Sequence, residues 1–219
     1  MSNVIASMRL DFYIQNSNYK RVFALGYALA IIVGVLTGTP YATVLIAMII
    51  SAAFTSFVFL VSEKNNLGSL YGTLPLRKSE LVLGRYLYAL LFGLGNVIAA
   101  SLLTWVISLV TGKTLAFPDL SAYLCAAFLY FCLFTSIVFP VYLRFGFSKN
   151  YLMTNVPLYI LYAVTYGFIR KGNLKDLHGV IQYFTRNPEM VWLGGLGGGL
   201  ALLAMSCGLS RLTYKRYER

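Results

Sequence analysis

The side chains that could do chemistry in this sequence are few and widely separated. The triplet Gly112-Lys113-Thr114 is typical of the end of a phosphate-binding loop, but Ile107 stands where that loop requires its first glycine. The single histidine, His178, excludes a zinc site of the His-Glu-x-x-His kind, and no Gly-x-Ser-x-Gly turn is present. We therefore expect no enzyme activity in this chain.

The three cysteines are the next candidates, for redox or metal chemistry. Cys125, Cys132 and Cys207 all stand inside long apolar stretches. On one helix, Cys125 and Cys132 would lie about 10 Å apart along the axis, too far for a disulfide bond. We interpret all three as small, polarizable packing residues rather than as a redox pair or metal ligands.

The elements that carry these residues must be membrane helices. Hydrophobic side chains make up 58% of the 219 residues, while 18 Lys and Arg and 7 Asp and Glu are too few to cover a soluble domain of this size. The net charge of +11 is explained by basic loops that face anionic lipid headgroups. We expect no nucleic-acid partner, because such binding requires a basic face on a soluble module.

Six stretches are long and apolar enough to cross the bilayer as helices, although the first is short. They run over residues 22–36, 41–61, 86–110, 121–143, 151–169 and 190–210. They do not alternate in segments of about ten residues, as the strands of a transmembrane barrel do. The sequence therefore predicts an all-α membrane protein in which residues 1–219 form a single transmembrane domain with six spans.

The basic residues predict the orientation of these spans. Because the number of spans is even, both termini lie on one side, and that side receives thirteen of the eighteen Lys and Arg residues. Cytoplasmic loops are the basic ones, so we predict that both termini and the segment 62–86 are cytoplasmic. Four basic residues between Arg170 and Arg186 run against this trend, on the external side, where His178 also falls.

Ion-driven transport has little support in the predicted spans. All seven Asp and Glu residues fall at termini, in loops or at span ends, which argues against a proton relay. Pro140 and Pro157 lie within predicted spans and can be interpreted in two ways. They are either simple helix kinks, which we favour, or breaks in the helices whose free carbonyl groups bind sodium. Asn96 and Asn155 are the most polar groups deep in spans. Hydrogen bonds between helices are favoured over substrate contact for both.

The stretch "SEKNNLGSLYGTLPLRKSELVLGRY", residues 62–86, is a polar block between two apolar runs. Residues 63–71 can form a short helix that ends at Gly72, and Pro75 prevents it from continuing into the next helix. Arg77, Lys78, Glu80 and Arg85 then lead into the third span. The segment is either a stiff element on which a cytoplasmic partner docks or an ordinary basic loop.

The run "EKNNLGSLYGTLPLRKSELVLGRYLYALL" resembles the cytoplasmic signature of type-2 ABC exporter permeases, small six-span bacterial membrane subunits. The resemblance implies that residues 62–85 form a coupling segment that rests in a groove of a separate ATPase subunit, which binds the ATP and Mg²⁺; this chain itself needs no cofactor. It also implies that Arg85 anchors the third span at the headgroups. The residues that would form or support the ATPase-docking surface are Glu63, Lys64, Tyr71, Thr73, Leu74, Pro75, Arg77 and Lys78.

Two further segments agree with this resemblance. Residues 1–20 begin with Met1, Val4, Ile5, Met8 and Phe12 on one face, which predicts an interfacial helix on the inner leaflet. In the family such an elbow helix abuts the ATPase. Residues 170–189 place apolar side chains at helical spacing behind a possible Asn173 cap, and resemble the short external helices before the last span of these exporters.

The expected function is that of a permease subunit in the bacterial cell membrane, where a second permease copy and an ATPase complete an exporter. Substrate class rests on the resemblance alone: an amphipathic peptide such as a toxin, or else a hydrophobic drug or lipid. A non-transporting immunity or scaffold subunit that binds a partner through residues 62–86 is the alternative. A second, less favoured alternative is an ion-coupled carrier.

Overall fold

The computed structural model describes residues 2–67, 77–147, 156, 159 and 192–214. All regular structure in these ranges is helical, so the predicted all-α class is confirmed for this part of the chain. The helices are α1 (Ser2–Leu36), α2 (Pro40–Thr55), α3 (Phe57–Lys64), α5 (Lys78–Thr111), α6 (Phe117–Phe145), the π-helical turn η2 (Leu193–Gly197) and α10 (Gly198–Thr213).

Four helical stretches of the described chain are long and apolar enough to cross a membrane. They are Pro40–Lys64, Lys78–Thr111, Phe117–Phe145 and Leu193–Thr213, and they match the predicted second, third, fourth and sixth spans. The first predicted span corresponds to Lys20–Leu36, which is joined to Asn3–Gln15 through a bend of 72° and makes a fifth span if the bent pair is counted as one. The fifth predicted span, 151–169, lies outside the described residues.

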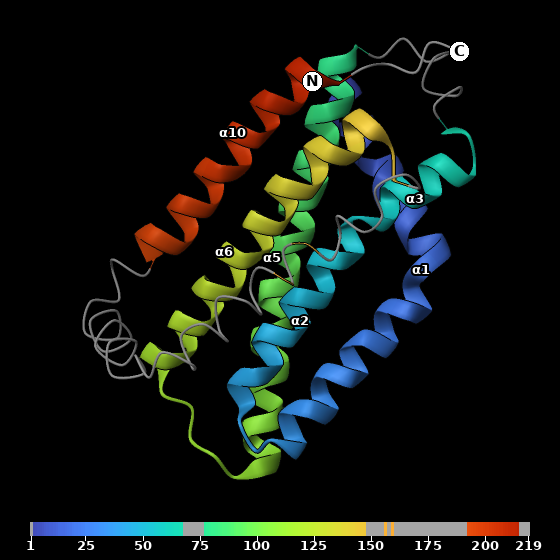
Figure 1. The fold of residues 1–219 in the computed structure, drawn as a ribbon. Helices are drawn as coiled ribbons and strands as arrows, with labels where there is room; N and C mark the ends of the chain where they lie inside the picture. The colour runs from blue at the N-terminus through green and yellow to red at the C-terminus, as the bar shows by residue number, and fades with distance from the viewer. Residues whose placement is uncertain (1, 68–76, 148–155, 157–158, 160–191, 215–219) are drawn as a thin grey trace.

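The long helices pack side by side as a bundle whose connections alternate between its ends (Figure 1). At one end Gly38, with φ +61°, closes the turn from α1 into α2, and Gly112, with φ +66°, ends α5. A side chain would strain both of these left-handed conformations. The Lys113 ammonium donates a hydrogen bond to the Gly38 carbonyl, and the Ala116 N–H donates to the Tyr41 hydroxyl at 3.2 Å, so the two connections are tied together.

We call the opposite end of the bundle the basic end, because α1 and α5 begin there and α3, α6 and α10 end there (Figure 1). Its basic residues are Lys20 and Arg21 of α1, after the bend, and Lys64, Lys78, Arg144 and Arg211 at the helix ends. Every described residue that the sequence assigned to the side of the termini lies toward this end. In the described part of the chain these basic residues are therefore gathered at one end, while Lys113 lies at the other.

The core of the bundle is aromatic and closely packed. Phe128, Phe131, Phe134 and Phe139 of α6 are fully buried. A methyl group added to Gly93 of α5 would meet the Phe131 ring at 2.5 Å, so the small residue permits this contact.

The last span approaches α6 through glycines. A methyl group added to Gly195 would lie 2.7 Å from the Cβ atom of Cys125, and one added to Gly199 would lie 3.0 Å from the Cys132 sulfur. Cys125, Cys132 and Cys207 are free and buried, and two of them pack against these glycines. The packing role predicted for the cysteines is therefore observed for Cys125 and Cys132.

Candidate functional site

The predicted docking residues fall on both sides of a part of the chain that the structure does not describe. Glu63 and Lys64 end α3, and Arg77 and Lys78 begin α5, all with exposed side chains. The other four, Tyr71, Thr73, Leu74 and Pro75, lie outside the described residues. The basic end therefore presents the four described docking residues to the surroundings.

The structure interrupts the helix expected over residues 63–71 at Asn65-Asn66, whereas Leu67 is helical again and residues 68–71 lie outside the described residues. Helix α3 ends at Lys64, and Asn66 adopts a left-handed conformation with φ +50°. Asparagine tolerates this conformation better than other non-glycine residues, so Asn65-Asn66 stops the helix that the polar pattern alone would extend. The second span thus ends in a turn near the start of the coupling segment.

Arg85, which the resemblance places at the headgroups, is buried between helices in the structure. Its residue is only 6% exposed, and the side chain contacts two other elements of the basic end. The Arg85 Nη2 donates a hydrogen bond to the Ser62 Oγ at 3.2 Å, and the guanidinium lies 4.6 Å from the centre of the Phe59 ring. Arg85 therefore connects the end of the second span, where the coupling segment begins, with α5, where the coupling segment ends.

Asp11 supplies the charge that faces Arg85. The Asp11 Oδ2 lies 3.8 Å from the Arg85 Nε, and Asp11 is only 1% exposed. Burial raises the pKa of Asp11 to about 6, although the Arg85 charge acts in the opposite direction. Because no described group donates a hydrogen bond to the Asp11 Oδ2, the ion pair compensates this buried carboxylate only in part.

The elbow helix, Asn3–Gln15, packs on the start of α5 through a polar face. Asp11 belongs to this face. The Asn3 side-chain amide donates a hydrogen bond to the Glu80 carboxylate at 3.3 Å. A methyl group added to Gly84 would lie 2.7 Å from the Ser7 Cβ, and the Tyr88 hydroxyl donates to the Gln15 side chain.

The contacting residues of the elbow helix recur every four positions, as do Glu80, Gly84 and Tyr88 on α5. This spacing aligns one face of each helix. Two rigid helices are thereby joined along polar faces beside the coupling segment.

Glu63 and Glu80 also have local structural roles. The Phe147 N–H, just after α6, donates a hydrogen bond to the Glu63 carboxylate at 2.8 Å. The Arg77 backbone N–H donates to the Glu80 carboxylate at 2.9 Å, which satisfies a donor at the start of α5. Glu63 therefore joins the ends of α3 and α6 besides its predicted docking role.

A second polar cluster lies beside Pro140, which stands inside α6. Proline lacks an N–H, so the carbonyl of Ser136, four residues earlier, loses its helical partner. The Ser206 hydroxyl of α10 donates to that carbonyl at 2.8 Å. Since this uses the only Ser206 hydroxyl proton, the Tyr86 hydroxyl must donate to the Ser206 Oγ at 2.7 Å.

The Ser210 Oγ lies 2.8 Å from the Tyr86 hydroxyl and must donate to it in turn. The chain of hydroxyl groups therefore ends on the Ser136 carbonyl, which already has its donor. This favours the interpretation of Pro140 as a kink over the sodium-binding one. Pro157 lies outside the described residues.

Asn96 is bonded between helices, as the sequence interpretation favoured. The Tyr27 hydroxyl of α1 donates to the Asn96 side-chain oxygen, and the Asn96 amide donates to the Phe92 carbonyl at 2.6 Å. In residues 2–67, 77–147 and 192–214, no three His, Cys, Asp or Glu side chains are close enough to hold a metal ion. Asn155 and His178 lie outside the described residues.

Sequence reasoning missed the Asp11–Arg85 pair, because both residues were assigned to a membrane surface. The available signal was the spacing of Ser7, Asp11 and Gln15, which marks a polar stripe along one face of the elbow helix. That stripe was expected to face water. In the structure all three residues are buried, and the apolar side chains of Ile5 and Phe12 are exposed instead.

Comparison with known proteins identifies the family of the chain. No curated protein and no solved structure matches the chain. The family model described as "ABC-2 family transporter protein" matches residues 8–215, which include the elbow helix from Met8 onward, the coupling segment and all predicted spans. The chain therefore belongs to the ABC-2 family of membrane transporter subunits.

Proposed function

We propose that this chain is the membrane-spanning subunit of an ATP-driven exporter and that its ATPase partner docks at the basic end. Membership in the ABC-2 family supports partnership with an ATPase subunit in general. The observation that carries the docking site is the position of Arg85, which lies on α5 and contacts both Ser62, the first residue of the coupling segment, and Asp11 of the elbow helix. A push on residues 62–86 would therefore move three elements together.

In this mechanism the ATPase pair closes when it binds ATP, and the coupling segment receives the movement. Helix α5 is rigid from Lys78 to Thr111, so a displacement at its first turn is carried to the opposite end of the bundle. The chain would work as a dimer, with itself or with a sister permease, in a bacterial cell membrane with both termini in the cytoplasm. Its substrate would be an amphipathic peptide, or else a hydrophobic drug or lipid.

Photo-crosslinking tests the docking site directly. A photoreactive amino acid at Lys78, on the basic end, is expected to capture an ATP-binding protein in native membranes, to be identified by mass spectrometry. The matched control is the same probe at Lys113, an exposed basic residue at the opposite end. Capture of the ATP-binding protein at Lys113 but not at Lys78 would overturn the assignment.

Reconstitution separates export from a scaffolding role. Substrate accumulation in vesicles that depends on ATP, together with substrate-stimulated hydrolysis, supports an exporter. An assembled complex that neither transports nor changes its ATP hydrolysis with amphipathic peptides, drugs or lipids identifies an immunity or scaffold subunit instead.

A further inference from the structure

The elbow helix exposes apolar side chains on the face that points away from α5. Phe12 is 59% exposed and Tyr13 is 73% exposed, while Ser7, Asp11 and Gln15 are buried on the inner face. A helix that faces water on its outer side has the opposite arrangement. The outer face therefore requires an apolar partner.

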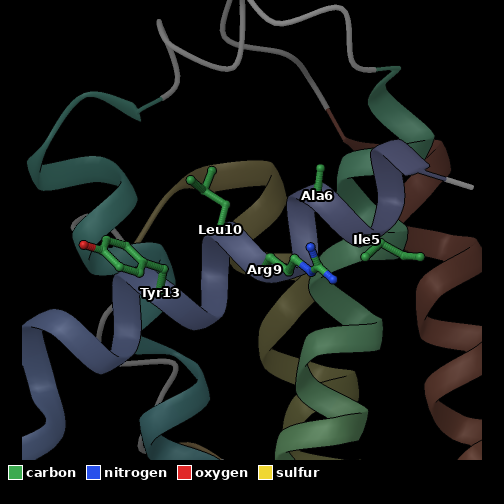
Figure 2. Close-up of a pocket in the computed structure, with 5 residues that line it drawn as sticks. All are labelled: Ile5, Ala6, Arg9, Leu10 and Tyr13. Atoms are coloured by element: carbon green, nitrogen blue, oxygen red, sulfur yellow. The ribbon is translucent and has the colours of Figure 1, made fainter.

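A shallow groove lies on this outer face and measures about 670 Å³ (Figure 2). It is lined by Ile5, Ala6, Arg9, Leu10 and Tyr13, all from the elbow helix. Ile5, Arg9 and Tyr13 are spaced four residues apart and form one ridge, and Ala6 and Leu10 form the next. The small Ala6 side chain leaves space between the two ridges, as in the grooves that accept a neighbouring chain.

The groove contains one charge. Arg9 is exposed, and in the part of the chain that the structure describes no carboxylate lies within ion-pair distance of it. An occupant that fits both features has an apolar chain to cover Ile5, Leu10 and Tyr13 and a negative group to meet the guanidinium. An anionic phospholipid has both.

The position of the groove relative to the first span also favours a lipid. The elbow helix is bent by 72° from Lys20–Leu36, so if that span crosses the bilayer the elbow helix lies near the membrane plane. The span begins with two exposed cations, Lys20 and Arg21, and continues with exposed Leu25 and Leu29. The groove is thus at the level where headgroups meet acyl chains.

We propose that this groove, which we call the elbow groove, binds one anionic phospholipid of the leaflet at the basic end. The acyl chain lies along Ile5, Leu10 and Tyr13, and the lipid phosphate pairs with Arg9. The bound lipid covers the outer face of the elbow helix while its inner face is held on α5. Lipid binding at this site needs no ATPase, so it can be tested separately from the proposed function.

Native mass spectrometry of the full chain tests this site. The protein is released from nanodiscs that hold equal amounts of phosphatidylglycerol and phosphatidylcholine, and the lipids that remain bound are counted. The wild-type chain is expected to retain phosphatidylglycerol preferentially. Arg9→Gln should reduce that preference about fivefold, the effect of about 1 kcal/mol for one basic side chain at an anionic surface.

Two matched controls separate the groove from general attraction to charge. Arg211→Gln removes an exposed cation at the same end of the bundle and should leave the preference unchanged. Ala6→Phe fills the groove while Arg9 stays, and should release the lipid, whereas Ala24→Phe on the exposed face of the first span should not.

Equal retention of the two lipids by the wild-type chain, or unchanged retention in both Arg9→Gln and Ala6→Phe, would overturn the proposal. Loss of ATPase binding in these two variants with no change in retained lipid would also overturn it, and would assign the groove to a protein.

Discussion

At the level of single residues, the proposed coupling depends most on the Asp11–Arg85 ion pair. Both side chains are almost fully buried, and the two residues are more than 70 positions apart in the sequence. Removing one member of a buried ion pair is costly because the other charge stays behind in a poorly solvated place. The free-energy cost of separating the two charges therefore holds the elbow helix on α5.

Arg85→Met leaves the buried Asp11 carboxylate without its cation. We expect the free energy of unfolding to fall by about 3–5 kcal/mol, measured by thermal unfolding of the purified protein. The double variant Asp11→Asn, Arg85→Met should recover part of this loss, because neither charge remains. Arg9→Met is the matched control, since Arg9 is exposed on the same elbow helix. Equal losses in Arg85→Met and Arg9→Met would show that the pair contributes nothing.

The pH dependence of stability reports on Asp11 itself. Burial raises its pKa from 3.8 to about 6, so between these values the folded protein binds a proton that the unfolded chain has released. Stability should therefore decrease as pH rises through this window, by at most about 1.4 kcal/mol per pH unit, and the penalty is complete above about pH 6. Asp11→Asn should remove this contribution. A variant whose unfolding follows the wild-type pH curve would contradict the burial of a titrating Asp11.

At the scale of elements, the contact between the elbow helix and α5 depends on Gly84. A methyl group there would lie 2.7 Å from both side-chain atoms of Ser7 and 3.1 Å from the Val4 carbonyl oxygen. Gly84→Ala should separate the helices and destabilise the protein, although alanine favours a helix by about 1 kcal/mol. Gly95→Ala is the matched control in α5, because nothing lies within 4 Å of the added carbon. It should be neutral or stabilising.

Separation of the two helices can be measured independently of stability. A cysteine in place of Ser7, which is buried, should react slowly with a maleimide in the wild-type background and faster when Gly84→Ala is added. Unchanged labelling would show that the elbow helix tolerates the extra methyl group in place.

Pro140 in α6 gives a second prediction at this scale. Ser206→Ala removes the donor to the Ser136 carbonyl and should cost about 1–2 kcal/mol. In a Pro140→Ala background the backbone N–H that alanine restores can bond that carbonyl, so the same substitution should cost less. A double-mutant cycle of unfolding free energies measures this coupling. Strict additivity of the two substitutions would disprove the link between them.

At the scale of the whole molecule, the apolar pattern predicted most of the architecture. The second, third, fourth and sixth spans appear close to their expected ranges, because about 20 apolar residues have few alternatives to a membrane helix. The positions of the basic residues also agreed with the helix ends. The expected dimer and the external helix at 170–189 stay predictions.

The sequence could not predict which face of each helix is buried against a neighbour. Asp11 and Arg85 carry charges that pattern rules place at a membrane surface, and only the packing of two distant segments buries them together. The turn at Asn65-Asn66 was not predicted for a similar reason, since the polar residues after Lys64 fit a helix as well as a turn. Glu63, Lys64, Arg77 and Lys78 have exposed side chains, and their role in docking an ATPase stays a prediction.

Transport in proteoliposomes tests the central claim, that force enters this permease from a separate ATPase at the basic end. Vesicles that contain the chain and its ATPase should move an amphipathic substrate only when ATP is present, and Pro75→Gly with Arg77→Glu should lower the substrate moved per ATP while the bundle stays folded. Uptake by the chain alone, driven by an imposed ion gradient at the rate of the full complex, would contradict the claim.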